Sequence, residues 1–249
     1  MPDPQYAKAI ALSQRIAADV GTPRFYAERR REVALSRDLF AAEPLVIRGL
    51  AIIEERDNCP GHGLTHIKKV AVDLGALILI EAADRLPLER ARRLVLLAHL
   101  AGVLHDICRM EKDHAERGAR EADGLLTSFP IQTDERRGIV EAIRNHEAFH
   151  SSRTVTGHDA QLLSDALYDA DKFRWGPDNF TDTLWAMIAP RGIPLEMLLP
   201  QFLPGLEGVR KVRDSFRTPT GKEYGPDFID RGLLIGQRVY AELHNGLKG

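Results

Sequence analysis

Residues 94–107, with the sequence LVLLAHLAGVLHDI, limit the possible folds of this chain more than any other stretch. Ten of these fourteen residues are aliphatic, so a helix formed here is apolar on nearly every face. That pattern is typical of a helix at the centre of a domain. The stretch nevertheless ends with His105 and Asp106. An ionised carboxylate inside a core is costly unless a cation or strong donors offset the cost, so we interpret this helix as the carrier of a metal site.

The period of the apolar residues predicts an all-α fold. Apolar residues recur mostly at spacings of three and four, and alternating, strand-like runs are scarce. We expect a single domain over residues 1–249, because the sequence shows no linker or internal repeat. The expected helices, separated at Pro, Gly and Asn clusters, cover residues 4–20, 23–40, 43–56, 64–83, 87–109, 113–127, 134–149, 158–173, 179–189, 194–215 and 226–245. Residues 217–226 (RTPTGKEYGP) are interpreted either as a long turn that reaches over a site or as a plain surface loop.

Composition narrows the classes of function. The formal net charge of −2 argues against a protein that binds nucleic acid through bulk positive charge. Cys59 and Cys108 form neither a disulfide framework nor a zinc-binding C-x-x-C motif. His99 and His105 interrupt the central apolar stretch before it reaches the about 18 residues of a membrane span. The amino terminus also lacks the regions of a signal peptide, so we expect a cytoplasmic protein without a membrane partner.

Further histidines and aspartates fall on expected core-facing stripes. His66 lies one turn before a buried valine position, His146 follows an isoleucine by three residues, and Asp171 follows a leucine by four. With His105 and Asp106, four helices thus each direct an imidazole or a carboxylate inward. Such mixed sets suit Mn, Fe, Ni, Co or Zn better than the all-oxygen sites of Mg or Ca. Taken together, these positions predict a site for one or two divalent ions.

Other polar residues are weaker candidates for the metal site. Asp113 precedes Glu116 at the spacing of a capping box, which would hold His114 in a first helical turn or leave it as a surface histidine. Asp169 is expected on the polar face of the helix that carries Asp171. Lys172 is adjacent to Asp171, but its side chain is expected to point away from the metal site.

An ordered set of residues resembles the HD-domain metal-dependent phosphohydrolase superfamily over residues 60–176: His66, His105, Asp106 and Asp171. The local sequences agree, with His-Ile-x-x-Val, Leu-His-Asp-Ile and Asp-Ala-Asp-Lys around these positions. The resemblance implies an all-α HD-type bundle in which these four residues bind one divalent metal. Residues 1–59 and 177–249 would then add helices at the two ends. The Gly-Tyr-Pro signature of the cyclic-di-GMP phosphodiesterases is absent after residue 146.

In some members of that superfamily, two further histidines hold a second ion, and the Asp of the His-Asp pair bridges the two metals. His114 and His146 match those positions. The resemblance therefore implies a binuclear ligand set.

The leading hypothesis is hydrolysis of a phosphate ester in a nucleotide or another small phosphorylated metabolite. A bound metal lowers the pKa of water from about 15.7 toward about 7, and the hydroxide attacks phosphorus in line. Asp106 would bridge the ions or position the hydroxide. Arg109 and Lys172 would hold phosphate oxygens, although a surface salt bridge is an equal alternative for both.

Two other functions stay open at this stage. A few HD-like proteins use the same six ligands for a mixed-valence di-iron centre that oxidises a small polar molecule. A non-catalytic sensing module is the third alternative, although all six candidate ligands are present. The sequence contains neither a P-loop nor a G-x-G-x-x-G motif, and it leaves homo-oligomerisation open.

Overall fold

The computed structural model describes residues 4–56, 63–83 and 85–246, so Cys59 lies outside the described residues. Every regular element in these ranges is helical, which confirms the all-α prediction. The elements are α1 (Pro4–Val20), α2 (Arg24–Glu28), α3 (Arg30–Ala42), α4 (Pro44–Glu54), α5 (Leu64–Ala82), α6 (Leu88–Leu104), α7 (His114–Leu126), α8 (Thr133–Arg144), α9 (His158–Phe173), the π-helical turn η1 (Asn179–Thr183), α10 (Leu184–Ile188), the 3-10 turn η2 (Ala189–Arg191), α11 (Leu195–Arg210) and α12 (Pro219–Gly246).

Helix α6 is the buried centre of the fold, as its sequence predicts. It packs against α3, α4, α5, α8 and α9, and every residue from 94 to 104 except Leu96 is buried. The contact with α5 is the closest, because a Cβ on Gly102 would lie only 2.6 Å from the Cα of Ala71. The absence of a side chain at this position therefore lets the two backbones approach each other.

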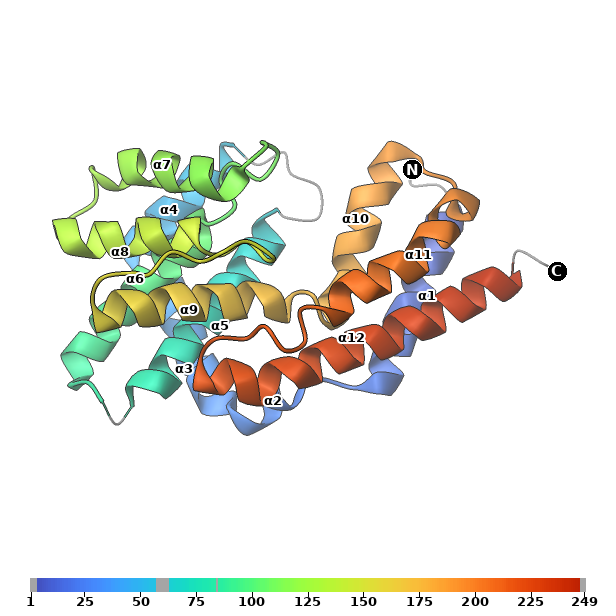
Figure 1. Cartoon of the computed structure of the whole chain (residues 1–249), viewed down its shortest axis with the longest axis horizontal. Helices are drawn as coiled ribbons and strands as arrows, with labels where there is room; N and C mark the ends of the chain where they lie inside the picture. The colour runs from blue at the N-terminus through green and yellow to red at the C-terminus, as the bar shows by residue number, and fades with distance from the viewer. Residues whose placement is uncertain (1–3, 57–62, 84, 247–249) are drawn as a thin grey trace.

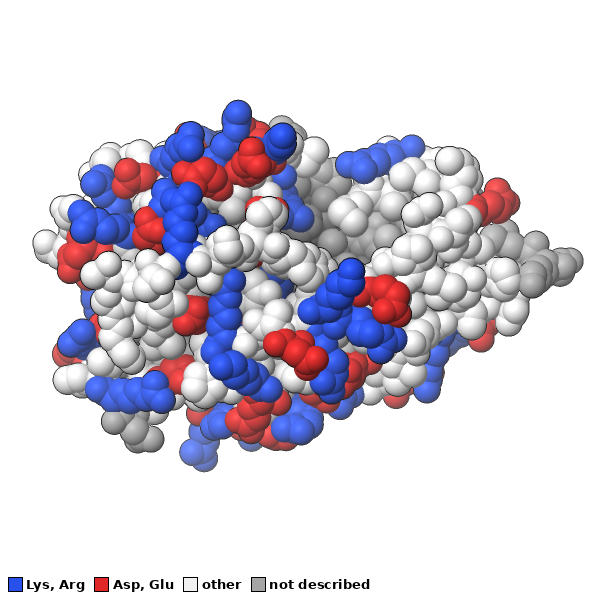
Figure 2. Space-filling model, viewed as in Figure 1, with Lys and Arg blue, Asp and Glu red and all other residues white. Residues whose placement is uncertain are grey.

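The helices gather in two halves (Figure 1). Helices α3 to α9 form one half, while α1, α10 and α11 form the other. The long helix α12 runs along both and contacts α1 and α11 as well as α5 and α9. Figure 2 shows basic and acidic residues interspersed over the first half, whereas the face around α10 and α11 carries few charges. None of the helices in the described ranges is long and apolar enough to span a bilayer.

Several helix boundaries differ from the prediction. The expected helix over residues 23–40 is divided between α2 and α3, and the one over residues 87–109 ends at Leu104. Helix α8 ends at Arg144, five residues before its expected end at residue 149. His105 and His146 therefore lie just beyond the ends of two helices rather than within them.

The prediction of a turn or loop over residues 217–226 is wrong, because α12 begins at Pro219. Thr218 caps this helix, since its Oγ1 accepts a hydrogen bond from the backbone N–H of Gly221 at 2.8 Å. Proline at the first helical position has no N–H to leave unsatisfied and already has a helical φ. The Thr-Pro pair is thus a helix start, and the helix continues through Pro226.

Candidate metal centre

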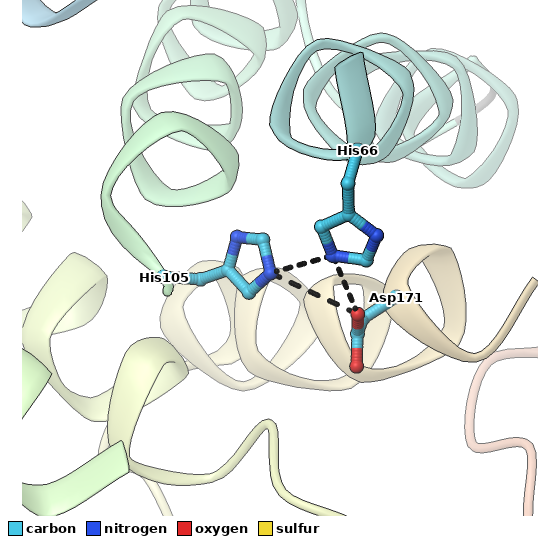
Figure 3. Close-up of side chains that lie close together, drawn as sticks. All are labelled: His66, His105 and Asp171. Atoms are coloured by element: carbon cyan, nitrogen blue, oxygen red, sulfur yellow. Dashed lines mark hydrogen bonds and ion pairs between the residues drawn. The ribbon is translucent and has the colours of Figure 1, made fainter. Parts of the chain in front are cut away.

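Three of the predicted ligands meet in the interior (Figure 3). His66 extends from α5, His105 follows the end of α6, and Asp171 extends from α9. The Nε2 atom of His66 lies 3.3 Å from Nε2 of His105 and 3.3 Å from Oδ1 of Asp171. The Nε2 atom of His105 lies 3.7 Å from the same carboxylate oxygen. All three side chains are buried.

Asp106 lies between this set and a second one. Its Oδ2 is 3.4 Å from Nε2 of His105 and 3.7 Å from Nε2 of His66. Its Oδ1 faces the other way, 3.4 Å from Nε2 of His146 and 3.9 Å from Nε2 of His114. One carboxylate thus offers an oxygen to each of two groups of imidazoles. The structure brings all six predicted ligands together in one buried cluster.

The ends of two helices orient two of the imidazoles. The last carbonyls of an α-helix have no partner within the helix. The Nδ1–H of His105 donates to the carbonyl of Gly102 at 2.7 Å, and the Nδ1–H of His146 donates to the carbonyl of Ile143 at 2.6 Å. Each bond places the ring proton on Nδ1 and leaves the Nε2 lone pair directed into the cluster.

The spacing of the ligand atoms suits a divalent ion. Ligands about 2.0–2.2 Å from a metal and about 90–110° apart lie about 3–3.5 Å from each other. The atoms of His66, His105 and Asp171, and those of His105, Asp106 and His146, form compact groups that could each hold an ion. Within the described part of the chain, the buried Nε2 of His146 has no hydrogen-bond partner, so a cation would satisfy it.

The electrostatics of Asp171 favour its ionised form. Burial alone would raise the pKa of Asp171, but the positive charge of Lys172 and a hydrogen bond from His66 hold that pKa well below its ordinary value. Burial lowers the pKa of His66. A charged carboxylate beside a neutral imidazole is the combination that metal binding requires.

Lys172 does not point away from the site, so that prediction is wrong. The side chain is buried, and Nζ bonds to Oδ2 of Asp171. The ammonium also lies 5.2 Å from the ring centre of Tyr168 and 5.6 Å from that of Trp175. Lys172 therefore fixes one oxygen of Asp171 and leaves the other directed toward the histidines.

Asp169 is also buried rather than on a polar face. It accepts hydrogen bonds from the backbone N–H groups of Arg217 and Thr218, both at 2.8 Å, and from the Thr218 hydroxyl at 2.7 Å. Burial raises the pKa of Asp169 to about 7 despite these donors. The residues that lead into α12 thus cover a face of α9 that the sequence pattern assigns to solvent.

The expected capping box before α7 is not formed. Asp113 adopts a left-handed conformation with a φ of 57°, and its side chain makes no capping hydrogen bond. Glu116 instead accepts a hydrogen bond from Nε of Arg144 at 2.9 Å. His114 is nevertheless buried at the first position of α7, so it is not a surface histidine.

Arg109 lies at the edge of the second set of ligands. Its Nη1 is 2.8 Å from Nε2 of His114 and 4.0 Å from Oδ1 of Asp106. Its side chain is 33% exposed, so the guanidinium connects the buried cluster with the solvent-facing side of the protein.

Sequence reasoning missed a buried charged network beside His66. The guanidinium of Arg174 bonds to Asp73 and Asp178, and to the Tyr26 hydroxyl at 2.7 Å. Asp73 lies seven residues after His66, on the same face of α5, and this spacing was the available signal. The network borders a cavity of about 670 Å³ between α1, α5 and α10.

Comparison of the chain with protein-family models, curated protein sequences and solved structures finds no match.

Proposed function

We propose that this protein is a metal-dependent phosphohydrolase that cleaves a small phosphate ester. The observation that carries the proposal is the position of Asp106, whose two oxygens face two sets of buried imidazoles. Buried imidazole and carboxylate groups with this spacing fit divalent Mn, Fe, Ni, Co or Zn. The partly exposed guanidinium of Arg109 beside the cluster suits an anionic substrate.

The residues around the cluster have distinct roles in this proposal. The tightest set would hold the ion: His66, His105, Asp106 and Asp171. When bound, a divalent ion polarises a phosphoryl oxygen and acidifies water at neutral pH. Lys172 keeps Asp171 ionised and correctly oriented. Arg109, which is partly exposed, offers N–H donors to a phosphate oxygen and compensates its charge.

The cavity beside His66 would accept the part of the substrate that does not react. Ile10, Trp185 and Ala186 give it an apolar wall. Its charged groups are already paired, since Nζ of Lys69 lies 2.9 Å from Asp178 and 3.0 Å from Asp182. We infer a small phosphorylated metabolite whose non-phosphate part is largely uncharged.

The test is release of inorganic phosphate from a panel of phosphomonoesters and nucleotides. The protein is stripped of metal and then supplied with Mn²⁺, Ni²⁺ or Co²⁺. We expect hydrolysis that depends on the metal and is lost in Asp106→Ala. Inactivity with every metal and every class of ester would contradict the proposal.

A di-iron oxygenase is the second candidate, because a carboxylate between two sets of nitrogen ligands also suits a pair of iron ions. The partly exposed guanidinium of Arg109 favours the phosphate ester. Anaerobic purification with an iron assay and oxygen-uptake measurements separates the two functions. Stoichiometric iron together with substrate-dependent oxygen uptake would favour the oxygenase.

A further inference from the structure

We propose that Arg109 takes the place of a second cation, so that the resting protein holds one divalent ion rather than two. The ion would be bound by His66, His105, Asp106 and Asp171. The guanidinium of Arg109 would exclude another ion from the set formed by Asp106, His114 and His146. This inference rests on the metal centre of the proposed function, and it requires no particular reaction.

The first observation is the position of the guanidinium. Arginine is always protonated and has only donors, so Nη1–H of Arg109 donates to Nε2 of His114 at 2.8 Å. The lone pair that His114 would offer to an ion is therefore already used. The same Nη1 lies 4.0 Å from Oδ1 of Asp106, which is the oxygen that faces the second set.

The second observation is that His114, unlike His105 and His146, is not prepared to bind an ion. His105 and His146 are oriented by backbone carbonyls at 2.7 and 2.6 Å. Among the described residues, His114 shows no such bond from Nδ1, and Oε1 of Glu147 lies 3.9 Å from that atom. Among the described residues, the compact groups able to hold an ion include His105 and His146 but not His114.

The third observation is the charge of the cluster. The negative charges of Asp106 and Asp171 are balanced by the positive charges of Lys172 and Arg109. One bound divalent ion therefore already gives the cluster a net charge of +2. A second divalent ion beside this guanidinium would face repulsion, because the ligands Asp106 and His146 are buried and charges next to them are poorly screened. Removing the charge of Arg109 should therefore strengthen binding of a second ion by about tenfold or more.

The experiment measures Co²⁺ bound to the full chain. Metal-stripped protein is loaded with Co²⁺, passed through a desalting column and examined by elemental analysis, and calorimetric titration gives the affinity of each ion. We expect one ion per wild-type chain and two per chain of Arg109→Met. Arg109→Gln, which also removes the charge, should behave in the same way and covers the case in which Arg109→Met fails to fold.

Two control variants locate the second ion. Arg109→Met combined with His114→Ala should return to one ion per chain. Arg117→Met removes an exposed arginine that pairs with Glu111, and it should leave the number of bound ions at one.

Two ions on the wild-type chain, one ion on both Arg109 variants, or no ion on any chain would overturn the inference. A chain that binds one ion but hydrolyses no ester would contradict the proposed function and leave this inference intact.

Discussion

His105 and His146 owe their orientation to the ends of α6 and α8. Each imidazole lies just after the last helical turn and donates to a carbonyl three residues earlier. The bond is made within the protein, so the ring does not need an ion to adopt its position. Such preorganisation reduces the ordering cost of metal binding.

The bridging position of Asp106 predicts a large effect of a small substitution. Asp106→Asn keeps the shape of the side chain but removes the charge shared by both sets of imidazoles. Loss of an outer-shell partner already costs about 10–100-fold in metal affinity, so we expect Co²⁺ affinity to fall by the upper end of that range, about 100-fold, measured by competition with a chromophoric chelator. The control is Asp165→Asn in α9, the helix that also carries Asp171. This variant should bind Co²⁺ with the affinity of the wild-type chain. Unchanged affinity in Asp106→Asn would contradict the assignment of Asp106 as a ligand.

His99 predicts a dependence of stability on pH that is separate from the candidate metal centre. Burial lowers the pKa of His99 to about 4, whereas an unfolded histidine titrates near about 6.5. Between these values only the unfolded chain binds the proton, so stability falls as the pH is lowered from about 6.5 to about 4. The loss attributable to His99 approaches about 3 kcal/mol.

His99→Gln removes this titration while leaving a polar side chain beside Ser36, whose Oγ lies 3.0 Å from Nε2 of His99. Urea unfolding near pH 7 and near pH 4.5 should show a smaller loss of stability in the variant than in the wild-type chain. Equal losses in the two proteins would show that His99 does not contribute.

Among the elements, the contact of α5 with α6 sets the positions of both His66 and His105. Gly102→Ala would place a Cβ 2.6 Å from Cα and 2.9 Å from Cβ of Ala71. The helices would have to separate, at a cost of about 1–3 kcal/mol in the free energy of unfolding. Gly124→Ala in α7 is the matched control, because no described atom lies within 4 Å of its Cβ position. It should stabilise the protein by about 0.5–1 kcal/mol, and chemical denaturation measures both.

The position of α10 opposite α5 predicts a change in substrate selection. Ala186→Trp would fill part of the cavity beside His66 and leave the candidate ligands unsubstituted. We expect kcat/KM to fall about tenfold or more for bulky phosphate esters and to stay unchanged for small ones. A uniform fall for all esters would show that the substrate does not occupy this cavity.

The sequence predicts elements well where one physical requirement dominates. The apolar run of α6 has no alternative to burial, and the inward-facing histidines and aspartates need a compensating charge. The prediction for Asp169 and Lys172 is wrong because it assumes one solvent-facing side for their helix. Helix α9 instead packs against α5, α6, α8 and α12, and the covering segment lies more than forty residues later in the chain. Local periodicity contains no information about such a distant neighbour.

On the scale of the whole molecule, the candidate metal centre connects segments from much of the chain. Its ligands come from α5, the segment after α6, α7, the segment after α8, and α9. An ion bound only by the folded protein stabilises it by about 2.7 kcal/mol at a free concentration 100 times its dissociation constant. We expect Co²⁺ to raise Tm and a chelator to lower it again. Asp171→Ala should abolish the shift, and an equal shift in that variant would contradict binding at this centre.

The hydrogen bonds to Asp169 have a consequence for any attempt to shorten the protein. A fragment that stops near residue 176 would retain every candidate ligand, yet it would lose the three donors from Arg217 and Thr218 that satisfy this acid. It would also uncover one side of α9, leaving an unsatisfied carboxyl group among newly exposed apolar surface. Such a fragment should precipitate when expressed alone, so transplanting this centre into another scaffold requires the carboxy-terminal helix to be carried along with it.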